Sequence, residues 1–128
     1  MATLPGEFIA AFPELEESYR DEDEFWQDDE GSNVSLNVRF VLAHEWIRPL
    51  LAVTDRTPDQ DLALVRAFEF LERMYDSDDL SVVAIADTGV IEGFCDHAGV
   101  RDVLPLMPRK VRYWTEVKIG IPHPEPEP

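Results

Sequence analysis

The segment from Thr57 to Asp76 constrains the fold of this chain more than any other. Thr57 is a favoured N-cap residue, and Pro58 stands at the first helical position, where its missing N–H has no partner to lose. The apolar side chains recur every three or four positions and form one stripe: Leu64, Ala67, Phe68, Leu71, Met74 and Tyr75. This spacing predicts an amphipathic surface helix. Because such a helix is stabilised mainly by packing of its apolar face, the rest of the chain must cover the stripe.

Residues 80–94 form the most apolar stretch of the chain. They follow a short acidic turn, residues 76–79, and carry apolar side chains on almost every helical face. Such a pattern is typical of a buried central helix, antiparallel to the helix before the turn. The β-branched residues around Gly89 also fit a β-hairpin. We favour the helix, in which Gly89 and Gly93 would mark a close crossing with another helix.

Residues 34–53 fit two patterns. Apolar and polar residues alternate up to Phe40, as in a strand. From there on, the apolar residues share one helical face: Phe40, Ala43, Ile47 and Leu50. Because the helical part is longer, we expect one long helix, capped by Ser32 or Asn33 and kinked or nearly ended by Pro49.

The two ends of the chain add shorter elements. Helical spacing relates Leu4, Phe8 and Phe12, and Pro13 suits the first turn of a second helix. Residues 100–106 allow two helical turns that prolines then stop. A last helix is expected over residues 109–119, with three residues on its inner face: Val111, Trp114 (or Tyr113) and Val117. From residue 121 every second residue is proline, which predicts an extended tail.

These elements predict a single all-α domain over residues 1–120, followed by a Pro-rich tail at 121–128. The domain should be a bundle of about five helices. Its core is expected to contain the following side chains: Phe40, Ile47, Leu64, Phe68, Leu71, Val83, Val90, Phe94, Val111 and Trp114.

The amino-acid composition limits the kinds of molecule that the chain is expected to bind. The chain has 128 residues, of which 45% are hydrophobic, enough for one domain with a real core. With 27 acidic and 11 basic residues its net charge is −16, which repels nucleic acids and anionic membranes. A single cysteine, Cys95, excludes an internal disulfide and a multi-cysteine zinc site. Since no secretory signal and no apolar run of membrane-spanning length occur, we expect a cytoplasmic protein.

The acidic charge is concentrated near the N-terminus. Residues 14–30 hold ten acids and one base, a local charge of −9. We expect this segment, 14–33, to be partly mobile and to bind a basic protein partner, with two aromatic anchors inside the charged rim. The residues assigned to this binding are Asp21, Glu22, Asp23, Glu24, Phe25, Trp26, Asp28 and Asp29. Residues 101–118 carry a local charge of +3, so the alternative is that the two segments pack against each other or steer each other.

One string matches a catalytic signature. Asp87-Thr88-Gly89 after an apolar run is the pattern of a homodimeric, retroviral-type aspartic peptidase, in which two such aspartates activate water. The glycine-rich flap and the other strands of that fold are missing from the sequence. As a structural residue, Asp87 would instead be half-exposed on a helix or paired with an arginine such as Arg101.

Three other candidates fail as metal sites. His44-Glu45 is followed by Arg48 where a zinc protease needs a second histidine. In Cys95-Asp96-His97 the adjacent side chains point apart on any regular element. The acidic run places Trp26 where a calcium-binding loop needs glycine. We therefore expect no metal and no cofactor.

The middle and the end of the chain resemble a known group of proteins. An amphipathic helix ending at residues 67–74 is followed by Asp78-Asp79-Leu80, by Val90 to Phe94 and by Leu104-Pro105-Leu106-Met107-Pro108 before a helix around Trp114. This resembles small, acidic, helical bacterial proteins that are often encoded beside polymorphic toxins and regarded as their immunity proteins. The resemblance covers residues 57–119 and leaves the acidic run outside it. It implies an all-helical fold and a binding function, and it assigns no functional residues.

We therefore expect a non-enzymatic binding protein, an immunity protein that neutralises a cognate toxin by covering its active site with an acidic surface. The alternatives from other classes are the aspartic peptidase that uses Asp87 and a regulatory adaptor without a toxin partner.

Overall fold

The structure is a computed structural model that describes residues 3–26 and 34–122, and the side chains of all these residues except 25 and 26. Every regular element in these two ranges is helical, with no strand. When helical segments that follow one another without a break are counted as one helix, these two ranges contain seven helices, whereas about five were expected. The count is higher because Pro13 separates α1 (Leu4–Ala11) from η1 (Pro13–Leu15) and α2 (Glu16–Trp26), and because residues 100–106 form a 3-10 helix, η4 (Val100–Leu106).

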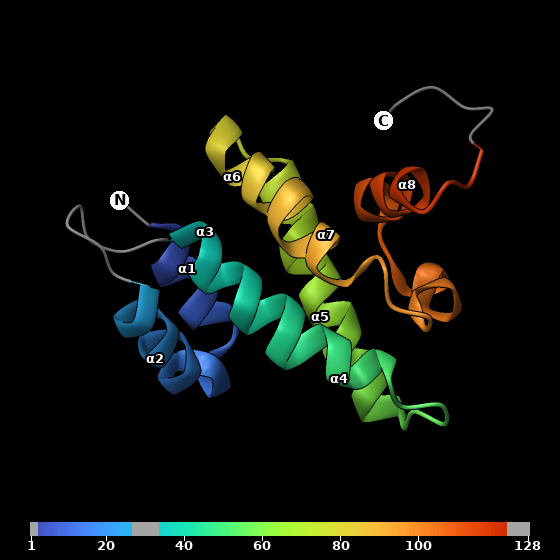
Figure 1. Cartoon of the computed structure of the whole chain (residues 1–128), viewed down its shortest axis with the longest axis horizontal. Helices are drawn as coiled ribbons and strands as arrows, with labels where there is room; N and C mark the ends of the chain where they lie inside the picture. Colours follow the sequence, from blue (N-terminus) through green and yellow to red (C-terminus); the bar gives the residue numbers. More distant parts are fainter. Residues whose placement is uncertain (1–2, 27–33, 123–128) are drawn as a thin grey trace.

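Two long helices lie side by side near the centre of the molecule (Figure 1). The first consists of α3 (Val34–Val38), η2 (Arg39–Ile47) and α4 (Arg48–Leu51), and the second of α6 (Leu80–Ala84), η3 (Ile85–Ile91) and α7 (Glu92–Phe94). In the middle of each helix, η2 and η3 are π-helical, with the wider i→i+5 hydrogen-bonding pattern. The prediction of helix rather than hairpin over residues 80–94 is thus confirmed. The first helix ends two residues after Pro49, as expected, while its expected caps Ser32 and Asn33 lie outside the described residues.

The two central helices lie in close contact at Gly93. A Cβ atom added to Gly93 would lie only 2.8 Å from Cβ of Ala43 on η2. A Cβ on Gly89 would lie 3.8 Å from Ile85 and 3.9 Å from Ser35, which are ordinary contact distances. The expected close crossing therefore lies at Gly93, where only a hydrogen atom fits.

The helix α5 (Pro58–Tyr75) begins as the sequence predicts. Thr57 Oγ1 accepts a hydrogen bond from the backbone N–H of Gln60 at 3.2 Å, and Gln60 Oε1 accepts one from the N–H of Thr57 at 2.9 Å. This reciprocal capping satisfies two N–H groups that the first turn leaves without helical partners. After a turn, Asp79 caps α6, which runs back antiparallel to α5 (Figure 1).

An aromatic cluster holds the N-terminal helices against α5. The ring of Phe70 on α5 lies 5.7 Å from those of both Phe8 and Phe12 on the N-terminal side. Phe12 also packs edge-on against Trp46 at 5.2 Å, and Trp46 Nε1 donates to the carbonyl of Ala63 on α5. Phe8 and Phe12 are almost completely buried. Burial of these rings anchors α1 to the bundle, since aromatic side chains remove a large apolar area from water.

Most of the expected core is confirmed. The fully buried members of the predicted set are Ile47, Leu64, Phe68, Leu71, Val90, Phe94 and Val111. Phe40, Val83 and Trp114 are only partly buried. Phe40 stacks on His44, and Trp114 packs edge-on against Tyr113, so both rings find partners near the surface.

The helix α8 (Arg109–Lys118) is capped by a residue from another helix. Both carboxylate oxygens of Glu72 on α5 accept backbone hydrogen bonds from its first turn, from Lys110 at 3.1 Å and from Val111 at 2.9 Å. The expected inner residue Val117 is 43% exposed, whereas Thr115 is buried. The prediction for Val117 is wrong because Glu72 fixes the rotation of α8 about its own axis, and no local pattern reports that contact.

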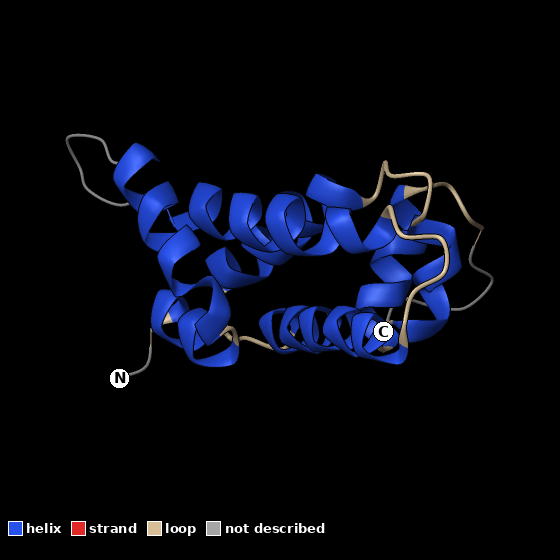
Figure 2. Ribbon diagram, turned by 90° about the horizontal axis from the view of Figure 1, so that it is seen from below, coloured by secondary structure: helices blue, strands red, loops and turns tan. Residues whose placement is uncertain are grey.

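Helices make up all regular structure in the described part of the chain (Figure 2). None of these helices combines the length and the apolar character needed to cross a lipid bilayer.

Candidate protein-binding surface

The acidic segment begins with an ordered helix that presents a row of carboxylates. Its apolar side is packed, since Leu15 and Tyr19 are buried. Glu17, Asp21 and Glu24 are exposed on α2, at spacings of four and three residues. Residues at these spacings lie on one face of a helix, so the three carboxylates form one row about 10 Å long. We call this row the acidic stripe.

The other predicted site residues occupy different positions. Asp23 Oδ1 accepts a hydrogen bond of 2.8 Å from Nδ2 of the buried Asn37, which ties α2 to α3. Asp21 and Glu24 belong to the acidic stripe, and Glu22 is half-buried. The backbones of Phe25 and Trp26 complete α2, but their side chains, together with Asp28 and Asp29, lie outside the described residues. The structure therefore leaves the aromatic anchors as a prediction, and it shows that the acidic segment is helical up to residue 26.

Glu45 adds a further carboxylate to this surface. It lies on η2, beside α2, and it follows the His44 of the failed zinc motif. The pKa of Glu45 is raised, mainly by desolvation and further by the neighbouring carboxylates of Glu22 and Asp21, against a lowering contribution from a Ser18 hydrogen bond. Negative charge is thus crowded where α2 meets η2, at a cost to the folded state when Glu45 is ionised.

We expect Glu45→Gln to raise the melting temperature at neutral pH. A carboxyl whose pKa is raised on folding opposes folding when it is ionised, so its penalty is absent below the unfolded pKa and complete above the folded one. The gain should therefore shrink as the pH falls through this range. Thermal unfolding across a pH series measures it, with Glu69→Gln, an exposed carboxylate of α5, as the matched control. A gain that does not depend on pH would contradict the crowding of charge.

The acidic and basic segments do not neutralise each other. The acidic α2 and the basic α8 lie at opposite ends of the molecule (Figure 1). On α8, Lys110 pairs with Asp76, Arg112 with Glu116 at 3.5 Å, and Lys118 with both Asp87 and Glu92 at 3.3 Å. For the described residues of the acidic segment, the alternative that the two segments pack together is therefore wrong. Lys110 and Lys118 pair with acids of neighbouring elements, and Arg112 pairs within α8 itself.

Asp87 has a structural environment. It lies on the π-helix η3, where its Oδ1 accepts a hydrogen bond of 2.8 Å from the Tyr75 hydroxyl and faces Nζ of Lys118. The pKa of Tyr75 is strongly raised by burial and then by this bond to Asp87, so the phenol stays protonated as the donor. The expected structural partner, Arg101, is replaced by Tyr75 and Lys118. The tripeptide Asp87-Thr88-Gly89 is thus helical, whereas the peptidase signature belongs in a loop after a strand.

The other chemical candidates remain separate. Among the residues that the structure describes, no group of three or more His, Cys, Asp or Glu side chains is arranged so that it could hold a metal ion. Asp96 pairs with Arg48 at 2.8 Å. The Cys95 thiol has a raised pKa, chiefly because it is partly buried, so it lacks the thiolate character of a nucleophile.

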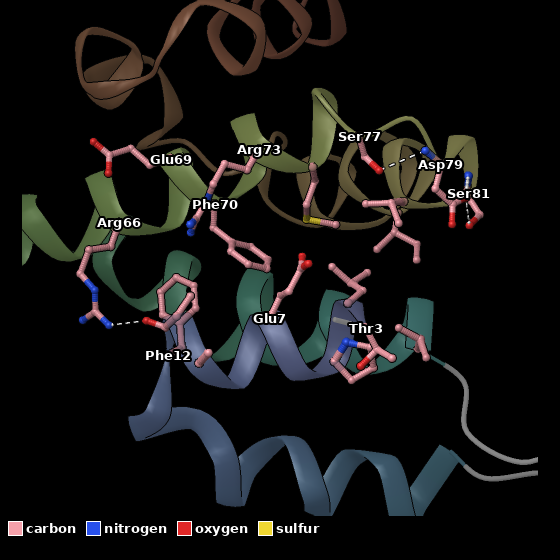
Figure 3. Close-up of a pocket in the computed structure, with 18 residues that line it drawn as sticks. Thr3, Glu7, Phe12, Arg66, Glu69, Phe70, Arg73, Ser77, Asp79 and Ser81 are labelled. Atoms are coloured by element: carbon pink, nitrogen blue, oxygen red, sulfur yellow. Dashed lines mark hydrogen bonds between the residues drawn. The ribbon is translucent and has the colours of Figure 1, made fainter. Parts of the chain in front are cut away.

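A groove between α1 and α5 was missed by sequence reasoning. It has a volume of about 1070 Å³ and is lined by α1, by the second half of α5 and by the turn into α6 (Figure 3). Its lining combines apolar side chains such as Phe70 and Met74 with charged ones such as Glu7 and Arg73, and Glu7 points from α1 into the groove (Figure 3). We call it the α1–α5 groove. The sequence did contain one signal for this groove. Phe70 is an apolar residue of α5 that lies outside the stripe predicted by the 3.6-residue period, which indicates a second apolar face on that helix.

Comparison with curated proteins and with solved structures gives no match. Comparison with protein families matches residues 5–119 to the family described as Domain of unknown function (DUF7674). The matched region includes the whole acidic run, residues 14–30, which the sequence resemblance had left outside. It extends from the second residue of α1 to beyond the end of α8, and thus includes the acidic stripe and nearly all of the α1–α5 groove. The chain therefore belongs to the DUF7674 family.

Proposed function

We propose that this chain is a non-enzymatic binding protein, a bacterial immunity protein that docks a basic toxin domain through α2 and covers its active site. The observation that carries the proposal is the acidic stripe together with Glu45. These carboxylates lie on helices held by the buried Tyr19 and by the Asp23–Asn37 hydrogen bond. A helix held in this way presents its charges in a fixed geometry, which lowers the entropy that binding would otherwise cost.

The charge distribution supports a basic partner. Within residues 14–30 the only base is Arg20, and it pairs with Glu16 at 2.5 Å. Desolvation first, and then the carboxylates of Glu22 and Asp21, raise the pKa of Glu45 in the free protein and so disfavour its ionised form. A lysine or arginine side chain of a partner placed among Asp21, Glu22 and Glu45 would relieve this repulsion. The complex would then gain energy from a charge pattern that destabilises the free protein.

The resemblance to toxin-associated immunity proteins supports the kind of partner. In this proposal the chain needs no chemistry of its own, because it acts by covering the groups with which the toxin binds its substrate. How far such a protein inhibits its toxin depends only on the affinity of the complex between the two.

The direct test is protection of a growing cell. We expect cells that express the toxin domain encoded by the neighbouring gene to grow when this chain is co-expressed, and the two purified proteins to elute as one complex. A variant in which Glu17, Asp21 and Glu24 are changed to Gln, Asn and Gln should protect less. Toxicity that persists with the wild-type chain, or the absence of a complex, would show that the proposal is wrong.

A further inference from the structure

The helix α6 is apolar and yet contributes no buried residue. Its sequence from Leu80 to Ala84 contains four apolar residues and one serine. Leu80 is 80% exposed, the highest value among the exposed large hydrophobic side chains of the described residues. Figure 1 shows why: α6 projects beyond the other helices at one end of the molecule. An apolar helix in this position leaves a surface that a folded protein normally covers.

The exposed helix stands directly beside the α1–α5 groove. Val82 and Ile85 form one wall together with Met74 of α5, and Leu4 and Val34 belong to the opposite side. The groove therefore offers an apolar floor of the kind that an exposed leucine needs. Leu80 cannot enter the groove of its own chain, because its neighbours Asp79 and Ser81 line the end of that groove while Leu80 itself is exposed.

Charges of both signs surround this apolar surface. Arg73 stands at the rim with its guanidinium 5.3 Å from the centre of the Phe70 ring, and it is exposed. Asp78 and Asp79, both exposed, precede Leu80 at the tip of α6. In a dimer with a two-fold axis, residue i of one copy contacts residue j of the other, and residue j of the first contacts residue i of the second. A surface that binds its own copy in this way must therefore carry both the positive and the negative member of each ion pair. Arg73 and the two aspartates meet this condition, whereas the acidic stripe would repel its own copy.

We infer that the occupant of this surface is a second copy of the chain. Leu80 of each protomer enters the α1–α5 groove of the other, and Arg73 of each faces Asp78 and Asp79 of its partner. The interface is isologous and closed, so it produces a dimer rather than a filament. It also leaves α2 outside the contact, which means that the dimer would carry two acidic stripes.

The test is the oligomeric state of the purified chain, measured by sedimentation equilibrium over a range of concentrations. We expect the wild-type chain to reach twice the chain mass. Leu80→Asp should weaken the dimer roughly 100-fold, because both copies lose a buried leucine and gain an ion next to Asp79. Arg73→Glu should weaken it as well, since it places like charges together at both ends of the interface.

Leu62→Asp is the matched control. Leu62 is also an exposed leucine, at 60%, but it lies near the start of α5 and away from the groove. This variant should dimerise like the wild type, and circular dichroism should show that all variants remain helical. A wild-type chain that is monomeric at every concentration would overturn the inference. A dimer that Leu80→Asp leaves intact, or that Leu62→Asp weakens equally, would overturn it too. Because no toxin enters this experiment, its outcome is independent of the proposed function.

Discussion

Gly93→Ala is expected to lower the free energy of unfolding by about 2 kcal/mol, whereas Gly89→Ala, four residues earlier on the same helix, should raise it by up to about 1 kcal/mol. The methyl group added at Gly93 would lie 2.8 Å from Cβ of Ala43, which belongs to a packed helix and cannot rotate away. The methyl group added at Gly89 meets nothing closer than 3.8 Å and removes the entropic cost of a helical glycine. Urea unfolding of the two variants measures both changes.

The double variant Ala43→Gly/Gly93→Ala tests the cause. It moves the methyl group from one side of the crossing to the other and restores the space between the helices. We expect it to be more stable than the sum of the two single substitutions predicts, by an amount comparable to the cost of the clash. Equal destabilisation by Gly89→Ala and Gly93→Ala would show that this contact does not limit the packing of the two central helices.

Neutralising the acidic stripe should slow association with a basic partner roughly tenfold at low ionic strength. The triple variant Glu17→Gln, Asp21→Asn and Glu24→Gln removes three charges that are exposed on one face of α2. The dissociation rate should change little, because steering acts before the complex forms. Added salt should reduce the on-rate of the wild type in the same way, since charges are screened over roughly 8 Å at physiological ionic strength.

A second triple variant serves as the control for this measurement. This variant combines Asp55→Asn, Asp59→Asn and Asp102→Asn and therefore removes the same total charge. The three exposed positions lie in the loop before α5, in the first turn of α5 and in η4, respectively. Surface-based binding kinetics with the proposed basic partner compares the two variants at two salt concentrations. An equal loss of on-rate in both variants would mean that only the net charge of −16 matters, and an unchanged on-rate in the first would move the interface away from α2.

Local sequence patterns predict those elements that are stabilised by their own residues. The start of α5 follows from Thr57 and Pro58, whose effects act within one helical turn. The restart at Pro13 and the turn before α6 depend on equally short-range chemistry. The concentration of acidic residues in this segment was likewise evident from the sequence. Once α2 was known to be helical, the helical period alone placed the three carboxylates of the acidic stripe in one row.

Within the π-helical segments, the 3.6-residue period no longer predicts which side chains are buried. In the first central helix, the buried residues Val38, Leu42, Ile47 and Leu51 follow one another at intervals of four, five and four. The interval of five falls within η2, where the i→i+5 pattern turns later side chains to a different face than a 3.6-residue period assigns. Phe40, expected in the core, is therefore half-buried, while Val41 and Leu42 are fully buried.

The sequence by itself determined the all-α class, the α5 helix with its cap and the location of the negative charge, and it favoured a helix over a hairpin for residues 80–94. Each of these depends on residue type and short-range spacing. Only the tertiary structure decided that Glu72 caps α8, that Tyr75 and Lys118 hold Asp87, and that α6 projects beside a groove. The physical reason is that these features join side chains that are far apart in the chain, and their geometry is set by how whole helices pack. No local pattern of residues contains that information.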